Sequence, residues 1–230
     1  MHRRHVDEGL GANPFVVLVD ITIAVAFFLV VFAISATLNS SQSLVQMTRQ
    51  ERQKRIRDQL AATLQRYFPN SQVKPFDVAL RTQIVVDPAG RRLAQIFENA
   101  SYQRVSILVP MFEPGTANPT PQAARIWSGL GAVVAHNWGQ LDYLQLHGIV
   151  GPSEQASKEG ALETSRSRAD AALKILQDQG TVSKAGNGQR GIPLKYVVAF
   201  GTGSELYANL KNNNRVDLVL FFPDDSRGIG

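Results

Sequence analysis

One acidic residue lies within a long apolar stretch near the start of the chain. Asp20 is the single charged residue of residues 14–38, PFVVLVDITIAVAFFLVVFAISATL. Burial in an apolar medium disfavours an ionised carboxylate and raises its pKa, so such a group can take up and release a proton near neutral pH. The alternatives are a polar residue that the helix tolerates and a carboxyl group that only hydrogen-bonds to a neighbouring helix. The functional interpretation is a carrier of protons or other cations.

Other chemistry has little support in the sequence. A phosphate-binding G-x-x-x-x-G-K-[ST] motif is absent, and Gly201-x-Gly203 lacks the third glycine of a dinucleotide site. No nucleophile, base and orienting group can be assembled from spacing. The four histidines do not have the spacing of metal ligands: His2, His5, His136 and His147. We therefore expect no enzyme activity and no cofactor.

The apolar stretch is long enough to cross a bilayer. At about 1.5 Å per residue, residues 14–38 extend roughly 37 Å as a helix, more than the ~30 Å hydrocarbon core. The run is longer than the h-region of a signal peptide, and no A-x-A cleavage site follows it. The sequence thus predicts an uncleaved transmembrane helix at 14–38, preceded by a short tail at 1–13.

The positive charge of the chain is concentrated beside this helix. The formal net charge is +5, and residues 49–57 carry five of the cations. A basic segment next to a membrane span contacts lipid head groups, or forms a solvated helix face, more often than it binds nucleic acid. We expect membrane lipid, and no nucleic acid, among the partners.

Residues 39–75 are predicted to form a stalk outside the membrane. The turn formers of residues 39–43, NSSQS, are expected to end the membrane helix. Ile56, Leu60, Leu64 and Tyr67 then follow helical spacing, which predicts an amphipathic helix over 44–67 that Pro69 ends. This helix could pack on itself or on the following domain, lie on a membrane, or regulate the protein as a plug.

The remainder, residues 76–230, has the pattern of one α+β domain. A turn at Asp87-Pro88-Ala89-Gly90 separates two alternating segments, and Thr120 with Pro121 is a helix N-cap followed by a favourable first helical residue. Gly180 is a suitable stop for a second helix. The predicted strands are 77–87, 91–97, 105–112, 141–150, 194–201 and 214–222, and the predicted helices are 121–135 and 161–178. This order predicts a sandwich with helices on one face of a mixed sheet.

Four segments in this order resemble the OmpA-like, peptidoglycan-associating domain over residues 105–222. They are 111–123 (MFEPGTANPTPQA), 164–169 (TSRSRA), 201–205 (GTGSE) and 213–216 (NNRV). The resemblance implies binding to the diaminopimelate-bearing peptide of peptidoglycan. It places the family's ligand-binding Arg at Arg168 and the Ser of the same motif at Ser165. A guanidinium suits this role because it can bind a carboxylate through two parallel hydrogen bonds.

The family's Asp does not carry over to this chain. Residues 146–150, LHGIV, stand where the family has G-H-T-D, and Ala161 replaces an Asn of the family. Glu154 is the candidate to replace this acid in binding peptidoglycan. The alternatives for the domain are dimerisation or another ligand, and for Arg168 a surface charge on a helix.

The segment VDITIAVAFFLVV, with the domain order that follows it, resembles the MotB-type subunit of ion-driven stators. The resemblance implies a homodimer inside a ring of five polytopic A-type subunits, with Asp20 as the ion carrier. We expect the transported ion to be H⁺ and not Na⁺. The same plan occurs in flagellar motors and in the ZorB component of Zorya phage-defence systems, and the sequence slightly favours the defence type. ExbD and TolR, which share the Asp-bearing helix but lack the domain, are runners-up. A membrane-to-wall tether without transport is a further alternative.

This resemblance also sets the expected topology. The cations at 49–57 alone would favour a cytoplasmic location for the residues that follow the span. A wall-binding domain requires the reverse. We therefore expect a single-pass protein of the bacterial inner membrane, with a cytoplasmic N-terminus and a periplasmic C-terminal domain.

Overall fold

The computed structural model describes residues 14–150, 158–183, 191–201 and 215–223, without the side chains of 14–17, 20, 36–48 and 158–159. The chain divides into two compact units, Met1–Thr48 and Arg49–Gly230. Predictions on the remaining residues, including those for Glu154, Gly203 and most of the 201–205 and 213–216 motifs, lie outside the described residues.

A single helix, α1 (Pro14–Tyr67), carries residues of both units. In the first unit its apolar side chains are exposed, Phe28 and Phe32 each to 73%. Within the described ranges, no helix has the length and apolarity of a membrane span. The membrane helix at 14–38 therefore stays a prediction.

The predicted end of this helix at residues 39–43 was wrong. α1 passes through NSSQS without a break and ends at Tyr67, shortly before Pro69 as expected. Ser and Asn cost only about half a kcal/mol each relative to Ala inside a helix, and the segment contains neither Gly nor Pro. Good helix formers on both sides are sufficient to carry the helix across such a segment.

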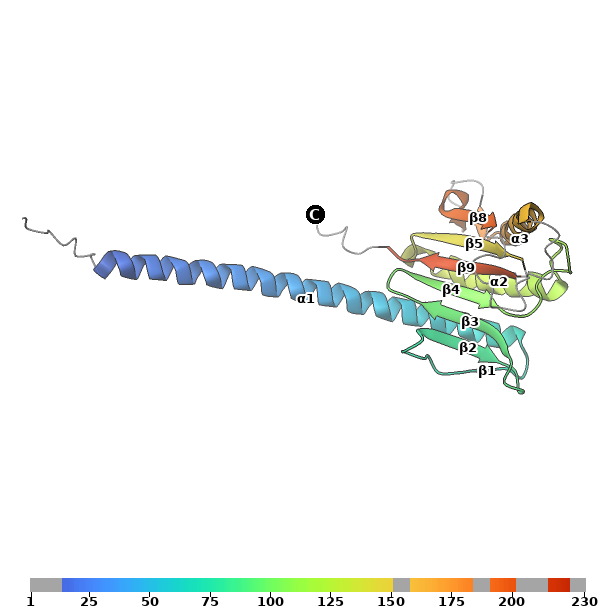
Figure 1. Cartoon of the computed structure of the whole chain (residues 1–230), viewed down its shortest axis with the longest axis horizontal. Helices are drawn as coiled ribbons and strands as arrows, with labels where there is room; N and C mark the ends of the chain where they lie inside the picture. The colour runs from blue at the N-terminus through green and yellow to red at the C-terminus, as the bar shows by residue number, and fades with distance from the viewer. Residues whose placement is uncertain (1–13, 151–157, 184–190, 202–214, 224–230) are drawn as a thin grey trace, which may run out of the picture. The chain divides into compact units, whose positions relative to one another are not determined.

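The second unit is built on a seven-stranded sheet in the order β1-β2-β3-β4-β9-β5-β8 (Figure 1). Its strands are β1 (Gln72–Val73), β2 (Thr82–Val86), β3 (Arg92–Glu98), β4 (Tyr102–Ile107), β5 (Tyr143–Ile149), β8 (Val197–Gly201) and β9 (Arg215–Phe221). β5 and β8 are parallel, and the other neighbouring pairs are antiparallel. This confirms the predicted mixed sheet.

Helices α2 (Pro121–His136) and α3 (Lys158–Asp178) cover one face of this sheet together with residues 49–67 of α1 (Figure 1). Alternate strand residues such as Leu144, Leu146, Leu218 and Leu220 form the core with Trp127 of α2. The predicted α+β class with helices on one face is confirmed. A separate parallel pair, β6 (Val182–Ser183) with β7 (Ile192–Pro193), and two short 3₁₀ helices, η1 (Trp138–Gln140) and η3 (Leu194–Tyr196), were not predicted.

The compact unit begins at Arg49, whereas the sequence placed the domain boundary at residue 76. The predicted amphipathic stripe is the reason, because Ile56, Leu60 and Leu64 have no exposed surface and lie in the domain core. Of the alternatives for this segment, packing on the domain is the one that the structure shows for residues 49–67.

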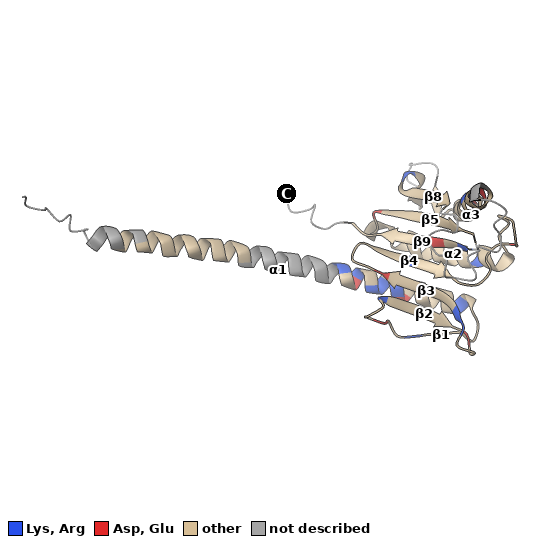
Figure 2. Ribbon diagram, in the orientation of Figure 1, with Lys and Arg blue, Asp and Glu red and all other residues tan. Residues whose placement is uncertain are grey.

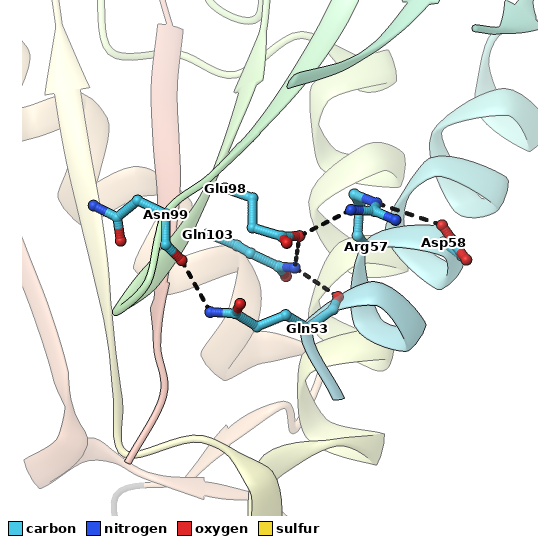
Figure 3. A network of polar contacts seen from close by, with 6 residues as sticks. All are labelled: Gln53, Arg57, Asp58, Glu98, Asn99 and Gln103. Carbon is cyan, nitrogen blue, oxygen red and sulfur yellow. Dashed lines mark hydrogen bonds and ion pairs between the residues drawn. The ribbon is translucent and has the colours of Figure 1, made fainter. Parts of the chain in front are cut away.

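A buried polar network joins the same helical segment to strands β3 and β4 (Figure 3). Arg57 Nη1 lies 3.2 Å from Glu98 Oε2, and their side chains are 8% and 12% exposed. Gln103 Nε2 donates to Glu98 Oε2 at 2.9 Å and to the carbonyl of Gln53 at 2.6 Å, and Gln53 Nε2 donates to the carbonyl of Asn99 at 3.1 Å. These contacts fix the position of the helix against the hairpin.

Figure 2 shows the basic run at 49–57 along α1, and several of its side chains contact the domain. Besides Arg57, Arg49 donates to the carbonyl of Phe222 at 3.4 Å and Arg55 donates to Gln140. These three cations serve packing of the helix, so the run is not simply a solvated face.

The predicted local signals are confirmed where they are described. Thr120 Oγ1 accepts the Ala123 N–H at 3.1 Å at the start of α2, and Gly180 beyond α3 has φ +69°. In the β2–β3 turn, Gly90 has φ +79° and its N–H donates to the Asp87 carbonyl at 2.9 Å.

Candidate functional site

The predicted site residues fall into two groups. Asp20 lies in α1, but its side chain is outside the described residues, as is all of Glu154. Arg168 and Ser165 lie on α3 and are described. The structure therefore brings together one part of the predicted wall site, at the C-terminal end of β5.

Arg168 is fully buried, so the alternative of a surface helix charge was wrong. Its Nε donates to the carbonyl of Thr116 at 2.9 Å and its Nη1 to the carbonyl of Ile149 at 3.4 Å. The guanidinium carbon lies 5.4 Å from the centre of the Phe112 ring. Arg168 thus connects the loop before α2 to the end of β5.

Two glycines let α3 approach the sheet at this point. A Cβ on Gly148 of β5 would lie 1.6 Å from the Ser165 carbonyl oxygen, and one on Gly201 of β8 would lie 2.3 Å from Ser165 Oγ. Ser165 is itself fully buried and donates to the carbonyl of Leu162 at 2.8 Å. A small residue is therefore required at Ser165, and the close packing sets the position of Arg168 one turn further along the helix.

The loop that receives Arg168 is closed by its own hydrogen bonds. The Glu113 N–H donates to Asn118 O at 3.0 Å, and the Thr116 N–H donates to Glu113 O at 3.1 Å. Asn118 Nδ2 also donates to the Glu113 carboxylate at 3.3 Å. Sequence reasoning missed Glu113, an exposed carboxylate on the turn that contacts Arg168. Glu113 lies in the segment 111–123, which resembles the OmpA-like domain, and this position was the signal that could have identified it.

A second buried charged cluster lies on the sheet face opposite the helices. Arg215 Nε and Asp217 Oδ1 are 2.8 Å apart within β9, with side chains 2% and 0% exposed. His147 of β5 is the cross-strand partner of Asp217. Sequence reasoning missed this cluster, although Arg215 and Asp217 alternate with the apolar Val216 and Leu218 in the printed sequence.

Burial dominates the protonation of this cluster. It lowers the pKa of His147 to about 4, helped by the nearby Arg104, so the imidazole is neutral at pH 7. Burial also raises the pKa of Asp217, while the Arg215 cation opposes that change. Among the residues that the structure describes, no group of three or more His, Asp or Glu side chains could hold a metal ion.

The fold and the site define a mixed α+β domain with a buried arginine between its β5 end and the loop before α2. No family model matches the chain, and no curated protein sequence matches it. Among solved structures, it is similar to the periplasmic domain of Helicobacter pylori MotB, with 11% identity over 65% of this chain and 92% of that one and a TM-score of 0.49.

Two further solved structures are similar at the same level. A MotB-like protein from Desulfovibrio vulgaris shares 18% identity over 77% of this chain and 97% of that one, with a TM-score of 0.47. The cell wall anchor of the type VI secretion system from Pseudomonas aeruginosa shares 13% over 57% and 89%, with a TM-score of 0.41.

Proposed function

We propose that this chain is the B subunit of a proton-driven rotary stator in the bacterial inner membrane, anchored to peptidoglycan. The single observation that carries the proposal is that one helix, α1, bears both the lone acid of an apolar stretch, Asp20, and the core residues of a domain that holds a buried Arg168. The resemblance of the sequence to MotB-type stator subunits relates this combination to a function.

The ion-carrying part of the proposal concerns Asp20. Two copies of the chain sit within five polytopic A-type subunits, and protons bind and leave the two carboxylates in turn. One charge crossing a membrane potential supplies about 2.3 kcal/mol per 100 mV, which is the energy available to rotate the ring. Within this class we propose the ZorB component of a Zorya defence system, with a flagellar MotB-type subunit as the alternative.

The wall-binding part of the proposal concerns Arg168. Its guanidinium contacts the carbonyls of Thr116 and Ile149, and a ligand carboxylate would bind it by replacing such a neutral acceptor with a charged one. A zwitterionic diaminopimelate also needs an acid for its ammonium group. Glu113, on the turn that contacts Arg168, and Glu154 are the acids proposed for it.

Retention on purified sacculi tests the wall-binding part. The full-length chain with Arg168→Lys keeps the charge but loses the planar fork, and we expect retention to fall about tenfold. Arg166→Lys, on the exposed face of the same helix, is the matched control and should bind as the unmodified chain does. Equal retention of both variants would remove Arg168 from the site.

Cellular activity separates the stator from a tether that does not transport ions. Asp20→Asn should abolish the cellular activity of the stator, which is phage defence or flagellar rotation. Asp20→Glu, which keeps an ionisable group, should retain a part of that activity. A tether predicts that both variants behave as the unmodified chain does. Co-purification of a polytopic partner encoded beside the gene would support the stator further.

A further inference from the structure

A tight turn between β1 and β2 holds two large aliphatic side chains in solvent. Residues 77–82 were predicted as part of a strand, but they form a closed turn in which the Asp77 N–H donates to Thr82 O at 2.8 Å and the Thr82 N–H donates to Asp77 O at 3.1 Å. Asp77 Oδ1 also accepts the Leu80 N–H at 2.9 Å. The turn is therefore fixed by its own hydrogen bonds.

Val78 is 79% exposed and Leu80 is 64% exposed. In the described part of the Arg49–Gly230 unit, no other large aliphatic or aromatic side chain is as exposed as these two. A closed turn could have presented polar side chains at these positions at no cost to its hydrogen bonds. Two convex apolar side chains on a well-formed turn therefore call for an apolar partner.

Three cations lie near Leu80 in this apolar tip. Arg81 follows Leu80 in the turn, and its carbonyl accepts the Glu98 N–H at 2.9 Å, which ties the turn to β3. Leu80 also borders a hollow of about 520 Å³ on the sheet face opposite the helices, where Lys74 and Arg92 contribute exposed cations. Asp77, the one acid in the hollow, uses Oδ1 to close the turn.

We propose that the turn at residues 77–82 and the adjacent hollow are a docking surface for an anionic phospholipid bilayer. Val78 and Leu80 enter the acyl boundary, while Lys74, Arg81 and Arg92 contact phosphate groups of the lipid heads. A protruding aliphatic tip with cations beside it complements a bilayer of this kind, in which an apolar layer lies beneath an anionic layer.

The same features do not fit a stable protein partner. A standard protein interface buries about 800 Å² on each side and centres on aromatic or arginine anchors in a closely packed patch. Here the protruding apolar part is two aliphatic side chains, and the aromatic ring in the hollow, Phe97, contacts Tyr102 at 6.0 Å between ring centres. A lipid surface needs no such area from the protein.

Site-specific fluorescence on the full-length chain tests the proposal. The chain has no cysteine, so Ala79→Cys provides a single attachment point for an environment-sensitive dye between Val78 and Leu80. Ala89→Cys, on the exposed β2–β3 turn, is the matched control site. Each labelled chain is reconstituted, through its predicted membrane helix, into vesicles of neutral lipid, with or without phosphatidylglycerol, and with lipids that carry a nitroxide quencher.

With phosphatidylglycerol, we expect a blue shift and nitroxide quenching at position 79 but not at position 89. The variant Lys74→Gln with Arg81→Gln should weaken the equilibrium between the docked and the free turn about 25-fold, at roughly fivefold for each cation. Val78→Ser with Leu80→Ser should weaken it by at least about tenfold. All four side chains are exposed, so folding should be unaffected.

Three results would overturn the proposal. The first is emission typical of water at position 79 in anionic vesicles. The second is an equal signal with neutral lipid, which would remove the role of the cations. The third is a blue shift in detergent that grows with protein concentration, which would assign the turn to contact with a second copy of the chain.

Discussion

Replacement of Glu98 by Ala should destabilise the domain by about 3 kcal/mol. The change leaves the Arg57 guanidinium, 8% exposed, without its buried acid, and it removes one acceptor from the Gln103 amide. Breaking a buried ion pair by removing one partner costs about 3–5 kcal/mol. We take the lower end because Gln103 keeps the Gln53 carbonyl at 2.6 Å and Arg57 keeps the Phe76 ring at 3.9 Å.

Asp58 provides a control on the same arginine. Its carboxylate lies 3.5 Å from Arg57 Nε, but its side chain is 52% exposed. An exposed pair of this kind contributes about 0–1 kcal/mol because water screens it. Asp58→Ala should therefore cost less than about 1 kcal/mol, although both variants remove an acid from Arg57.

Denaturant unfolding of the full-length chain, followed by tryptophan fluorescence, measures both values. Both tryptophans, Trp127 and Trp138, lie in the Arg49–Gly230 unit, so the signal reports on that unit. A loss for Glu98→Ala no larger than that for Asp58→Ala would refute the argument that burial makes this network stabilising.

Two other variants and one titration test the packing and the charges of the same unit. Leu60→Ala should lower the free energy of unfolding by about 2–5 kcal/mol, because Leu60 has no exposed surface. A loss under about 1 kcal/mol would indicate that this helix is a stalk that does not pack on the domain. Gly148→Ala should prevent stable folding through its clash with Ser165, whereas Gly139→Ala, whose Cβ meets nothing within 4 Å, should be tolerated; equal thermal stability of the two would contradict the close approach. The His147 ring should show no NMR titration from pH 8 to 5, because its pKa is about 4 in the folded chain against 6.5 in the unfolded chain. The contribution of His147 to stability is therefore lost as pH falls from about 6.5 towards 4. A titration midpoint near pH 6.5 would contradict the burial of this ring.

Elements with strong local signals could be predicted from the sequence. The Thr120 cap, the Gly90 turn and the strand β9 each depend on residues close together in the chain, and these elements formed where expected. The continuation of α1 through residues 39–43 and the closed turn at 77–82 could not be predicted. In both segments the intrinsic propensities are weak, so neighbouring structure determines the conformation. The sequence around Asp77 is compatible both with a strand residue and with a residue that caps a turn.

The candidate site was predicted less completely than the fold. The motif at 164–169 located Arg168 and Ser165, but it gave no information on their burial, because burial depends on β5, β8 and the loop before α2 coming together. The pair Arg215 and Asp217 was missed for a related reason. Charged residues in a strand normally indicate a solvated face, and no local pattern shows that this part of the sheet is covered.

Proton flux through membranes that contain the chain and the polytopic partner proposed for it tests the central claim most directly. In vesicles with an imposed potential and a pH-sensitive dye inside, the unmodified complex should acidify the lumen, and Asp20→Asn should reduce the flux to the level of empty vesicles. Thr22→Ala, two residues away in α1, is the control and should conduct as the unmodified complex does. Undiminished flux with Asn at position 20 would contradict the claim that this carboxylate carries the ion.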